Sequence, residues 1–338
     1  MIVYPKIAGR MSVDYVSSRE TCLERNGALM CGIVGLLIRD PALEPELGTL
    51  LAQMLASLGD RGPDSTGIAV YSQHDPIGAS SSIEENETDV LRISLASEGA
   101  FPGVELQALL ANTNVSTKGL RCFPNGAWLS VPVSQAPEAM SLIGAHCPSI
   151  RVIGVGTNLS VVKDIGRPED VCERYEVERW RGSMAIGHTR MATESAVTVL
   201  HCHPFVPAAN LCVVHNGSFS NHASVRRRLQ AEGIEFDSDN DSEVAARLIA
   251  KRLALGDDLE EATRWLTKEM DGFFTMVITN AEGMTVVRDA FACKPAVVAE
   301  TSRYVVVASE YRALAGLPGI EAATVYEPEP EEVYTWKR

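Results

Sequence analysis

The segment MCGIVGLLIRDP, residues 30–41, decides how the rest of the chain is interpreted. Its apolar part, residues 31–38, is short and rich in strand-forming residues, and Asp40-Pro41 follows it. A buried strand with a turn after it is therefore expected. A cysteine, Cys31, stands where that strand begins. Considered alone, Cys31 is interpreted as a buried strand cysteine, the commonest setting for this residue type.

The bulk composition is that of an ordinary globular protein, with 338 residues of which 46% are hydrophobic and 22% charged. The net charge of −14 makes a nucleic acid or an anionic membrane an unfavourable partner. No apolar run approaches the ~20 residues of a membrane span, and residues 1–30 lack the apolar stretch of a secretory signal. The eight cysteines form no CxxC pair. A cytoplasmic protein with reduced thiols is therefore expected.

Hydrophobic periodicity predicts a helix after the first strand, and later a block of helices followed by closely spaced strands. The expected helices lie near residues 47–58, 222–231, 242–254 and 259–270, and the expected strands include 66–71, 184–190, 211–215 and several apolar runs after 272. Asp241-Ser242-Glu243 is expected to cap the helix at 242. This order favours an α+β fold in which helices pack on antiparallel sheets.

The chain is expected to divide into an N-terminal extension, residues 1–30, and one domain, residues 31–338. Within that domain, residues 72–180 or so are less regular and contain strand-like pieces at 91–97, 127–133 and 150–162. This stretch is interpreted as an insertion in the core fold rather than an independent domain.

Five short clusters contain residue types that could together hydrolyse the side-chain amide of a free amino acid. Such a reaction needs a nucleophile, a base, an oxyanion site and groups that hold the amino-acid head. The clusters are MCGIVG (30–35), RGPDSTG (61–67), GHTRMAT (187–193), HNG (215–217) and NDSE (240–243). Each of them is a weak signal when it is taken singly.

Cys31 needs activation as a nucleophile, because few unperturbed thiols are ionised at neutral pH. If Cys31 began the mature chain, its own α-amino group, with an unperturbed pKa of about 7.7–8, could serve as the base. Met30 immediately precedes Cys31. Translation that starts at Met30, followed by removal of that methionine, is one route to such a chain. Cleavage of a propeptide between Met30 and Cys31 is the alternative.

The remaining parts of the site have candidates as well. The side-chain amide of Asn216 and the backbone N–H of Gly217 could bind one developing oxyanion, although an Asn-Gly pair is more often only a turn. The guanidinium of Arg190 could clamp an α-carboxylate. Asp241 could accept a hydrogen bond from an α-ammonium group, and a role as helix cap is an equally good interpretation of it.

Together these motifs resemble the class II (Ntn-type) glutamine amidotransferases, in which a mature N-terminal cysteine precedes Gly-Ile-Val/Phe-Gly. The shared motifs are CGIVG, RGPDSTG, GHTRMAT, HPF, HNG and NDSE, in family order, and the later segments VVRDAFACKPAVV and YVVVASEYRAL are also similar. The resemblance implies a four-layer αββα Ntn-hydrolase sandwich with two antiparallel sheets. It implies Cys31 as nucleophile with its freed amine as base, and Asn216 and Gly217 as the oxyanion hole. Substrate binding is implied for Arg190, Asp241, Arg61 and Thr193.

The sequences of the segments GHTRMATESAV, HNGSFSNH and EYRAL most resemble those of the stand-alone glutaminase-like subunit of N-methylglutamate synthase and related glutamate synthase-like complexes. The sequence ends about 95 residues after Asp241, so no synthase domain is expected in this chain. The resemblance therefore implies a cytoplasmic hetero-oligomer in which GXGXG-type and FMN-binding synthase subunits act in trans. No cofactor is expected in this chain, and FMN and any iron–sulfur cluster would belong to the partner subunits.

Three other interpretations stay open at this point. The chain could be a free-standing Ntn amidohydrolase that acts on a γ-glutamyl amide, or a catalytically silent assembly subunit. It could also bind zinc through His201, Cys202 and His203 together with His188 and His215. On a strand, however, Cys202 would point away from His201 and His203, and no metal site is expected.

Overall fold

Two antiparallel sheets lie face to face at the centre of the computed structural model, which describes residues 31–78, 89–191 and 197–338. In spatial order, the first sheet consists of β15 (Thr324–Tyr326), β13 (Val297–Glu300), β14 (Tyr304–Ala308), β1 (Gly32–Ile38), β8 (Met184–Arg190), β2 (Ser65–Tyr71) and β7 (Leu159–Ile165). The second consists of β16 (Val333–Lys337), β12 (Gly283–Arg288), β11 (Gly272–Asn280), β10 (Leu211–Phe219) and β9 (Phe205–Ala208).

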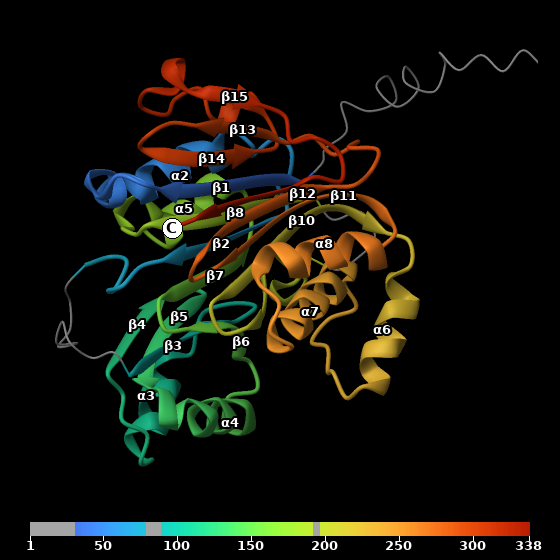
Figure 1. The fold of residues 1–338 in the computed structure, drawn as a ribbon. Coiled ribbons are helices and arrows are strands. Elements are labelled where there is room, and N and C mark those ends of the chain that lie inside the picture. The colour runs from blue at the N-terminus through green and yellow to red at the C-terminus, as the bar shows by residue number, and fades with distance from the viewer. Residues whose placement is uncertain (1–30, 79–88, 192–196) are drawn as a thin grey trace, which may run out of the picture.

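Helices cover the outer face of each sheet (Figure 1). The outer face of the first sheet packs against α2 (Leu47–Ala56) and α5 (Pro168–Arg174). The outer face of the second packs against α6 (His222–Ala231), α7 (Asp241–Ala254) and α8 (Leu259–Glu269). The described residues also contain short 3₁₀ turns: η1 (Pro41–Glu46), η2 (Val133–Gln135), η3 (Val177–Arg179), η4 (Val199–His201), η5 (Tyr311–Ala313) and η6 (Ile320–Ala322). The predicted four-layer αββα sandwich is confirmed.

Strand β1 shows why its sequence is apolar without alternation. Ile33 and Leu37 face the second sheet, whereas Val34 and Leu36 face α2 and the other outer groups. Every residue of the strand is buried. Because both faces of β1 lie in a core, a continuous apolar run is required at this position.

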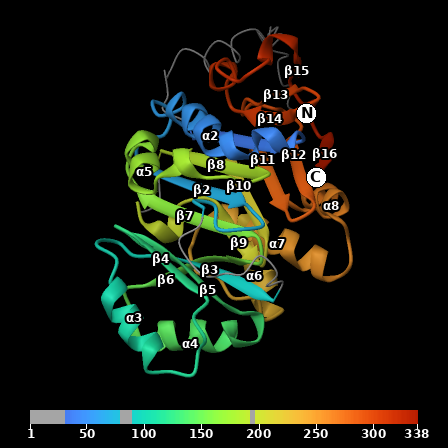
Figure 2. The same cartoon turned by 90° about the vertical axis from the view of Figure 1, so that its left-hand side faces the viewer.

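The described residues between β2 and β7 form a separate layer, seen at the bottom of Figures 1 and 2. It contains β3 (Val90–Ala96), α3 (Gly103–Ala111), β4 (Gly119–Phe123), β5 (Gly126–Pro132), α4 (Ala136–His146) and β6 (Arg151–Gly156). Its sheet has the order β4-β5-β3-β6 and is antiparallel throughout, which is the split βαβ arrangement. Its helices and sheet share a core of their own, and Trp128 Nε1 donates to the carbonyl of Val161 in β7 at 3.0 Å.

This inserted layer differs in two respects from the sequence-based expectation. The chain returns to the main sheet at β7, so the insertion is shorter than the expected range of about 72–180, and the expected strand at 150–162 is the two strands β6 and β7. Helices α3 and α4 were not expected. Each buries only two or three side chains, so that neither leaves a clear helical periodicity in the sequence.

Candidate active site

A cleft of about 360 Å³ lies where β1 begins, β8 ends and α7 starts. Its lining includes Cys31, Arg190, Gly217 and Asp241. The ladders explain this convergence, because Gly32 pairs with Thr189 and so places the residue before β1 beside the end of β8. The structure therefore brings together four predicted residues that come from four separate segments of the sequence.

Cys31 is partly buried, and its environment disfavours ionisation of the thiol. Burial raises the pKa of the Cys31 thiol, and the nearby charges of Arg190, Lys294 and Arg61 offset this effect only in part. The Sγ atom lies 4.0 Å from the carbonyl oxygen of Met191. A thiol in this setting is protonated at neutral pH, so a base has to remove its proton before it attacks.

The backbone carbonyl of Cys31 is held by two side chains from distant parts of the chain. Arg61 Nε donates to this oxygen at 3.2 Å, and Asn216 Nδ2 donates to it at 3.0 Å. Arg61 also forms an ion pair with Glu310. Arg61 is not among the residues that line the cleft, and it contacts the backbone of Cys31 instead. Thr193, which was expected to line the pocket, lies outside the described residues.

Gly217 has a backbone conformation that only glycine adopts readily. Its φ is +149°, and a Cβ atom at this position would lie 1.9 Å from the carbonyl oxygen of Phe273. Phe274, which lies opposite Gly217 in the ladder, directs both of its backbone polar groups to Asp289: its N–H donates to the Asp289 side chain, and its carbonyl accepts from the Asp289 N–H. In an antiparallel ladder this leaves the Gly217 N–H directed away from β11. The neighbouring Asn216 has a second side-chain N–H besides the one that it donates to Cys31.

Arg190 ends β8 and is buried, with 5% of its surface exposed. It lies opposite Ser65 in β2, and its carbonyl accepts a hydrogen bond from Asp64 N at 3.0 Å. A Cβ atom on Gly62 would lie 2.6 Å from the backbone nitrogen of Arg190. The RGPDSTG motif therefore packs directly against the end of β8, and this contact explains why glycine is needed there.

Asp241 is the first residue of α7, but it does not cap the helix as was expected. Asn240 is the cap, and its Oδ1 accepts from Ser242 N at 2.8 Å. The carboxylate of Asp241 instead accepts from Phe219 N at 2.8 Å and from Ser242 Oγ at 3.2 Å. Because the neighbouring residue satisfies the helix end, the Asp241 carboxylate is available to line the cleft.

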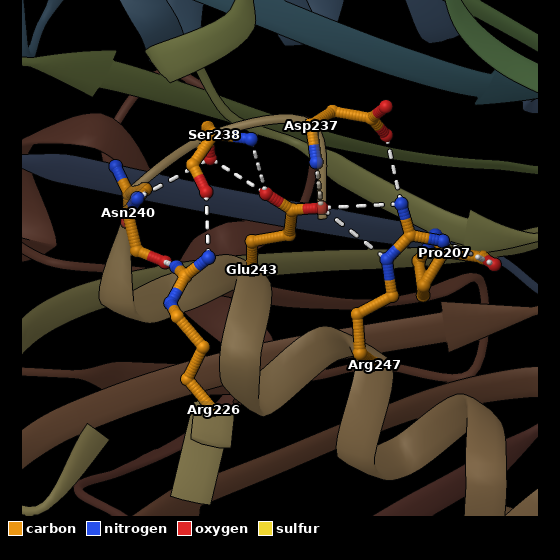
Figure 3. A network of polar contacts seen from close by, with 7 residues as sticks. All are labelled: Pro207, Arg226, Asp237, Ser238, Asn240, Glu243 and Arg247. Atoms are coloured by element: carbon orange, nitrogen blue, oxygen red, sulfur yellow. Dashed lines mark hydrogen bonds and ion pairs between the residues drawn. The ribbon is translucent and has the colours of Figure 1, made fainter. Parts of the chain in front are cut away.

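The loop that leads into α7 is fixed by a buried carboxylate (Figure 3). Glu243, 3% exposed, accepts from Asp237 N at 2.9 Å, from Ser238 N at 2.8 Å and from Ser238 Oγ at 2.7 Å. Arg247 pairs with Glu243 at 3.1 Å and with Asp237 at 2.7 Å. Arg226 donates to the carbonyl oxygens of Ser238 and Asn240. These contacts set the position at which Asp241 enters the cleft.

Three histidines, His188, His203 and His215, form a buried histidine cluster beside the cleft. The His188 and His203 rings stack with centroids 4.1 Å apart, and the His203 and His215 centroids are 6.4 Å apart. Burial lowers the pKa of His188 to about 3, that of His203 to well below its ordinary value, and that of His215 as well. All three imidazoles are therefore neutral at neutral pH.

The zinc interpretation finds no support in the described part of the chain. His201 lies 2.7 Å from Thr198 Oγ1 and 2.6 Å from Asp239 Oδ1, and Cys202 Sγ bonds the carbonyl of Thr198. Within residues 31–78, 89–191 and 197–338, no group of three or more histidine, cysteine or acidic side chains is placed to hold a metal ion.

Several residues of the site were not assigned a role in amide hydrolysis from the sequence. Glu310, Ser242 and His215 all lie in motifs that were noticed, namely YVVVASEYRAL, NDSE and HNG. Their importance depends on contacts with residues far away in the chain, such as that between Glu310 and Arg61. Spacing along the sequence does not reveal such contacts.

Comparisons with known proteins identify relatives among the glutamine amidotransferases. A family model described as "Glutamine amidotransferase domain" matches residues 188–316. The glutamine amidotransferase-like protein GlxB of Rhizobium meliloti is 43% identical over 307 residues, which cover 91% of this chain and 98% of that protein. A glutamine–fructose-6-phosphate aminotransferase (isomerizing) of Chlamydia caviae is 35% identical over 189 residues, which cover 56% of this chain and 31% of that protein.

A solved structure of glutamine phosphoribosylpyrophosphate amidotransferase from B. subtilis, complexed with ADP and GMP, has the same fold. It superposes with a TM-score of 0.56 at 18% sequence identity, over 91% of this chain and 49% of that chain.

None of the helices in the described ranges is long and apolar enough to cross a membrane.

Proposed function

The chain belongs to the class II glutamine amidotransferases, and we propose that within this family it is a glutaminase that releases ammonia from glutamine with Cys31 as its nucleophile. The observation that carries the proposal is the convergence of Cys31, Arg190, Gly217 and Asp241 on one cleft. A thiol, a guanidinium, a backbone N–H and a carboxylate are the groups that an amide with an α-amino-acid head requires.

The proposed reaction begins when the thiol of Cys31 loses its proton to the α-amine and attacks the Cδ of glutamine. The C=O double bond becomes a C–O⁻ bond, and the oxyanion accepts from the Gly217 N–H and the second N–H of Asn216. The tetrahedral intermediate then collapses, the C–N bond breaks, and ammonia leaves with the proton from the α-amine. Water attacks the resulting γ-glutamyl thioester, which gives glutamate and regenerates the thiol.

This mechanism requires that the bond between Met30 and Cys31 be cleaved, because an amide nitrogen cannot act as the base. The raised pKa of the Cys31 thiol supports the need for such a base. The hydrogen bonds of Arg61 and Asn216 to the Cys31 carbonyl also support the mechanism, because they fix the position of the residue that would carry the α-amine.

Substitution of the nucleophile tests the proposal. Cys31→Ala should abolish the release of glutamate and ammonia from glutamine and leave the thermal unfolding midpoint nearly unchanged. Cys122→Ala is the matched control, since Cys122 is an exposed, free cysteine in β4 of the inserted layer. The proposal fails if Cys31→Ala retains glutaminase activity, or if Cys122→Ala loses it as well.

The acceptor of the ammonia, in this proposal, is a separate glutamate synthase-like complex of the N-methylglutamate synthase type. One observation supports it: the sequences of the motifs GHTRMATESAV and HNGSFSNH resemble those of the glutaminase-like subunit of such complexes. Purification of the native protein tests this part. Co-purification with GXGXG-type and FMN-binding subunits is expected, and a protein that purifies alone with full glutaminase activity would favour a free-standing amidohydrolase.

A further inference from the structure

A chain of hydrogen bonds runs from the cleft into the interior beneath Asp241. Asp241 Oδ1 accepts from Ser242 Oγ at 3.2 Å, and Ser242 Oγ lies 2.7 Å from His215 Nδ1. Asp241 Oδ1 is also 3.9 Å from His215 Nδ1. Both Ser242 and His215 are buried, with 1% and 2% of their surface exposed, whereas the side chain of Asp241 is 19% exposed. These hydrogen bonds therefore link a carboxylate that faces the cleft to two buried groups in the cleft wall.

The direction of each hydrogen bond in this chain follows from the chemistry of the groups. An ionised carboxylate accepts only, so the single proton of the Ser242 hydroxyl goes to Asp241. The oxygen of Ser242 must then accept from His215, which places the proton of the neutral imidazole on Nδ1. The other ring nitrogen, Nε2, is buried and has no hydrogen-bond partner in the described part of the chain.

The ring of His215 is held in the orientation that these hydrogen bonds require. It stacks on Phe219, with centroids 4.5 Å apart and an angle of 19° between the planes. The carbonyl of His215 accepts from His188 Nε2 at 3.1 Å, which ties this part of β10 to β8. Phe219 also donates its backbone N–H to Asp241 Oδ2 at 2.8 Å. The same short stretch of β10 therefore positions both oxygens of the Asp241 carboxylate.

We propose that Ser242 and His215 are positioning residues that aim the Asp241 carboxylate at the α-ammonium group of the substrate, and that they thereby make the site select amides of free α-amino acids. This inference rests on the proposed function. With its two oxygens oriented by Phe219 and Ser242, the carboxylate directs its remaining lone pairs into the cleft. A carboxylate without these contacts rotates, and the advantage of a substrate that carries an α-ammonium group is reduced.

The test compares glutamine with glutaramate, the same amide without the α-amino group. Ser242→Ala should lower kcat/KM for glutamine by about tenfold, the effect of one lost positioning hydrogen bond, mainly through a higher KM. The value for glutaramate should change by less than about twofold, because that substrate has no group for Asp241 to bind. A merely structural role of Ser242 would lower both values together.

A second pair of variants at His215 covers the case in which Ser242→Ala folds poorly. His215→Phe keeps a ring against Phe219 but removes the donor to Ser242, and His215→Asn keeps a side-chain N–H near the position of Nδ1. Selectivity for glutamine over glutaramate should fall about tenfold in the phenylalanine variant and should be largely restored in the asparagine variant. Equal selectivity in the two variants and the wild type would overturn the inference.

Binding measurements separate this inference from the proposed function. If the mature protein hydrolyses no glutamine, the proposed function fails, and calorimetry with glutamate and glutarate still reports the selectivity of the cleft. The inference predicts that Ser242→Ala weakens the binding of glutamate and leaves that of glutarate unchanged. An equal loss for both ligands, or no loss for either, would contradict it.

Discussion

Glu243→Ala removes the carboxylate that fixes the loop in front of α7. The alanine variant leaves the N–H groups of Asp237 and Ser238 without their acceptor and separates Arg247 from its buried partner. The loop carries Asn240, the helix cap, and leads directly into the helix that begins with Asp241. The substitution should therefore affect both the stability of this region and the binding of substrate.

The size of the effect can be worked out from these contacts. A hydrogen bond to a charged group contributes about 1.5–3 kcal/mol, and loss of one partner from a buried ion pair costs about 3–5 kcal/mol. The loop itself is partly exposed, and the side chain of Asp237 is 74% exposed, so water can replace some of the lost contacts. We therefore expect the free energy of unfolding to fall by about 3 kcal/mol, the lower end of the range for a buried ion pair that loses one partner.

Denaturant unfolding combined with hydrogen exchange measures this effect. Exchange should accelerate in peptides that span residues 236–243, and the KM for glutamine should rise. Glu260→Ala on α8 is the matched control, because Glu260 forms an exposed pair with Arg264 and its loss should change stability by less than about 1 kcal/mol. If Glu243→Ala is no less stable than Glu260→Ala, and exchange in residues 236–243 is unchanged, the reasoning about this network is wrong.

Three further predictions concern the cleft and the cluster behind it. Gly217→Ala should reduce kcat by at least about tenfold, since φ is +149° and the added Cβ would meet the carbonyl of Phe273 at 1.9 Å; steady-state kinetics with unchanged kcat would contradict this. Arg190→Lys should chiefly raise the KM for glutamine, because lysine cannot form a bidentate clamp, and an unchanged KM would remove Arg190 from the carboxylate site. The buried histidine cluster has lowered pKa values, so below about pH 6.5 the unfolded chain binds more protons than the folded one. The free energy of unfolding should therefore fall with decreasing pH below about 6.5, by up to ~1.4 kcal/mol per pH unit for each histidine, and a pH-independent unfolding midpoint between pH 7 and pH 5 would contradict this.

The central sandwich could be predicted from the sequence because its patterns are local. The continuous apolar run of β1 reflects burial of both faces of the strand, and the helical spacing of α7 reflects burial of one face of the helix. The inserted layer was predicted less well. Helix α3 buries only Leu106 and Leu110, so its sequence has no clear helical periodicity. Its formation depends on tertiary packing, which local sequence patterns do not reveal.

The candidate site divides in the same way. Cys31, Arg190, Gly217 and Asp241 lie in short motifs, and their convergence follows once the strands are paired. The contacts that hold them do not follow from the sequence. The cap of α7 is a clear example: Asn240 and Asp241 are adjacent residues of similar capping propensity, and the choice between them depends on the contact of Asp241 with Phe219 in β10.

The mass of the native, purified protein, measured together with its glutaminase activity, tests the central proposal most directly. The proposal predicts that the active form begins at Cys31, with a free α-amino group that can take the proton of the thiol. A protein that retains residues before Cys31 and still hydrolyses glutamine would contradict the N-terminal nucleophile mechanism. A form that begins at Cys31 and shows no activity toward glutamine would contradict the proposed function.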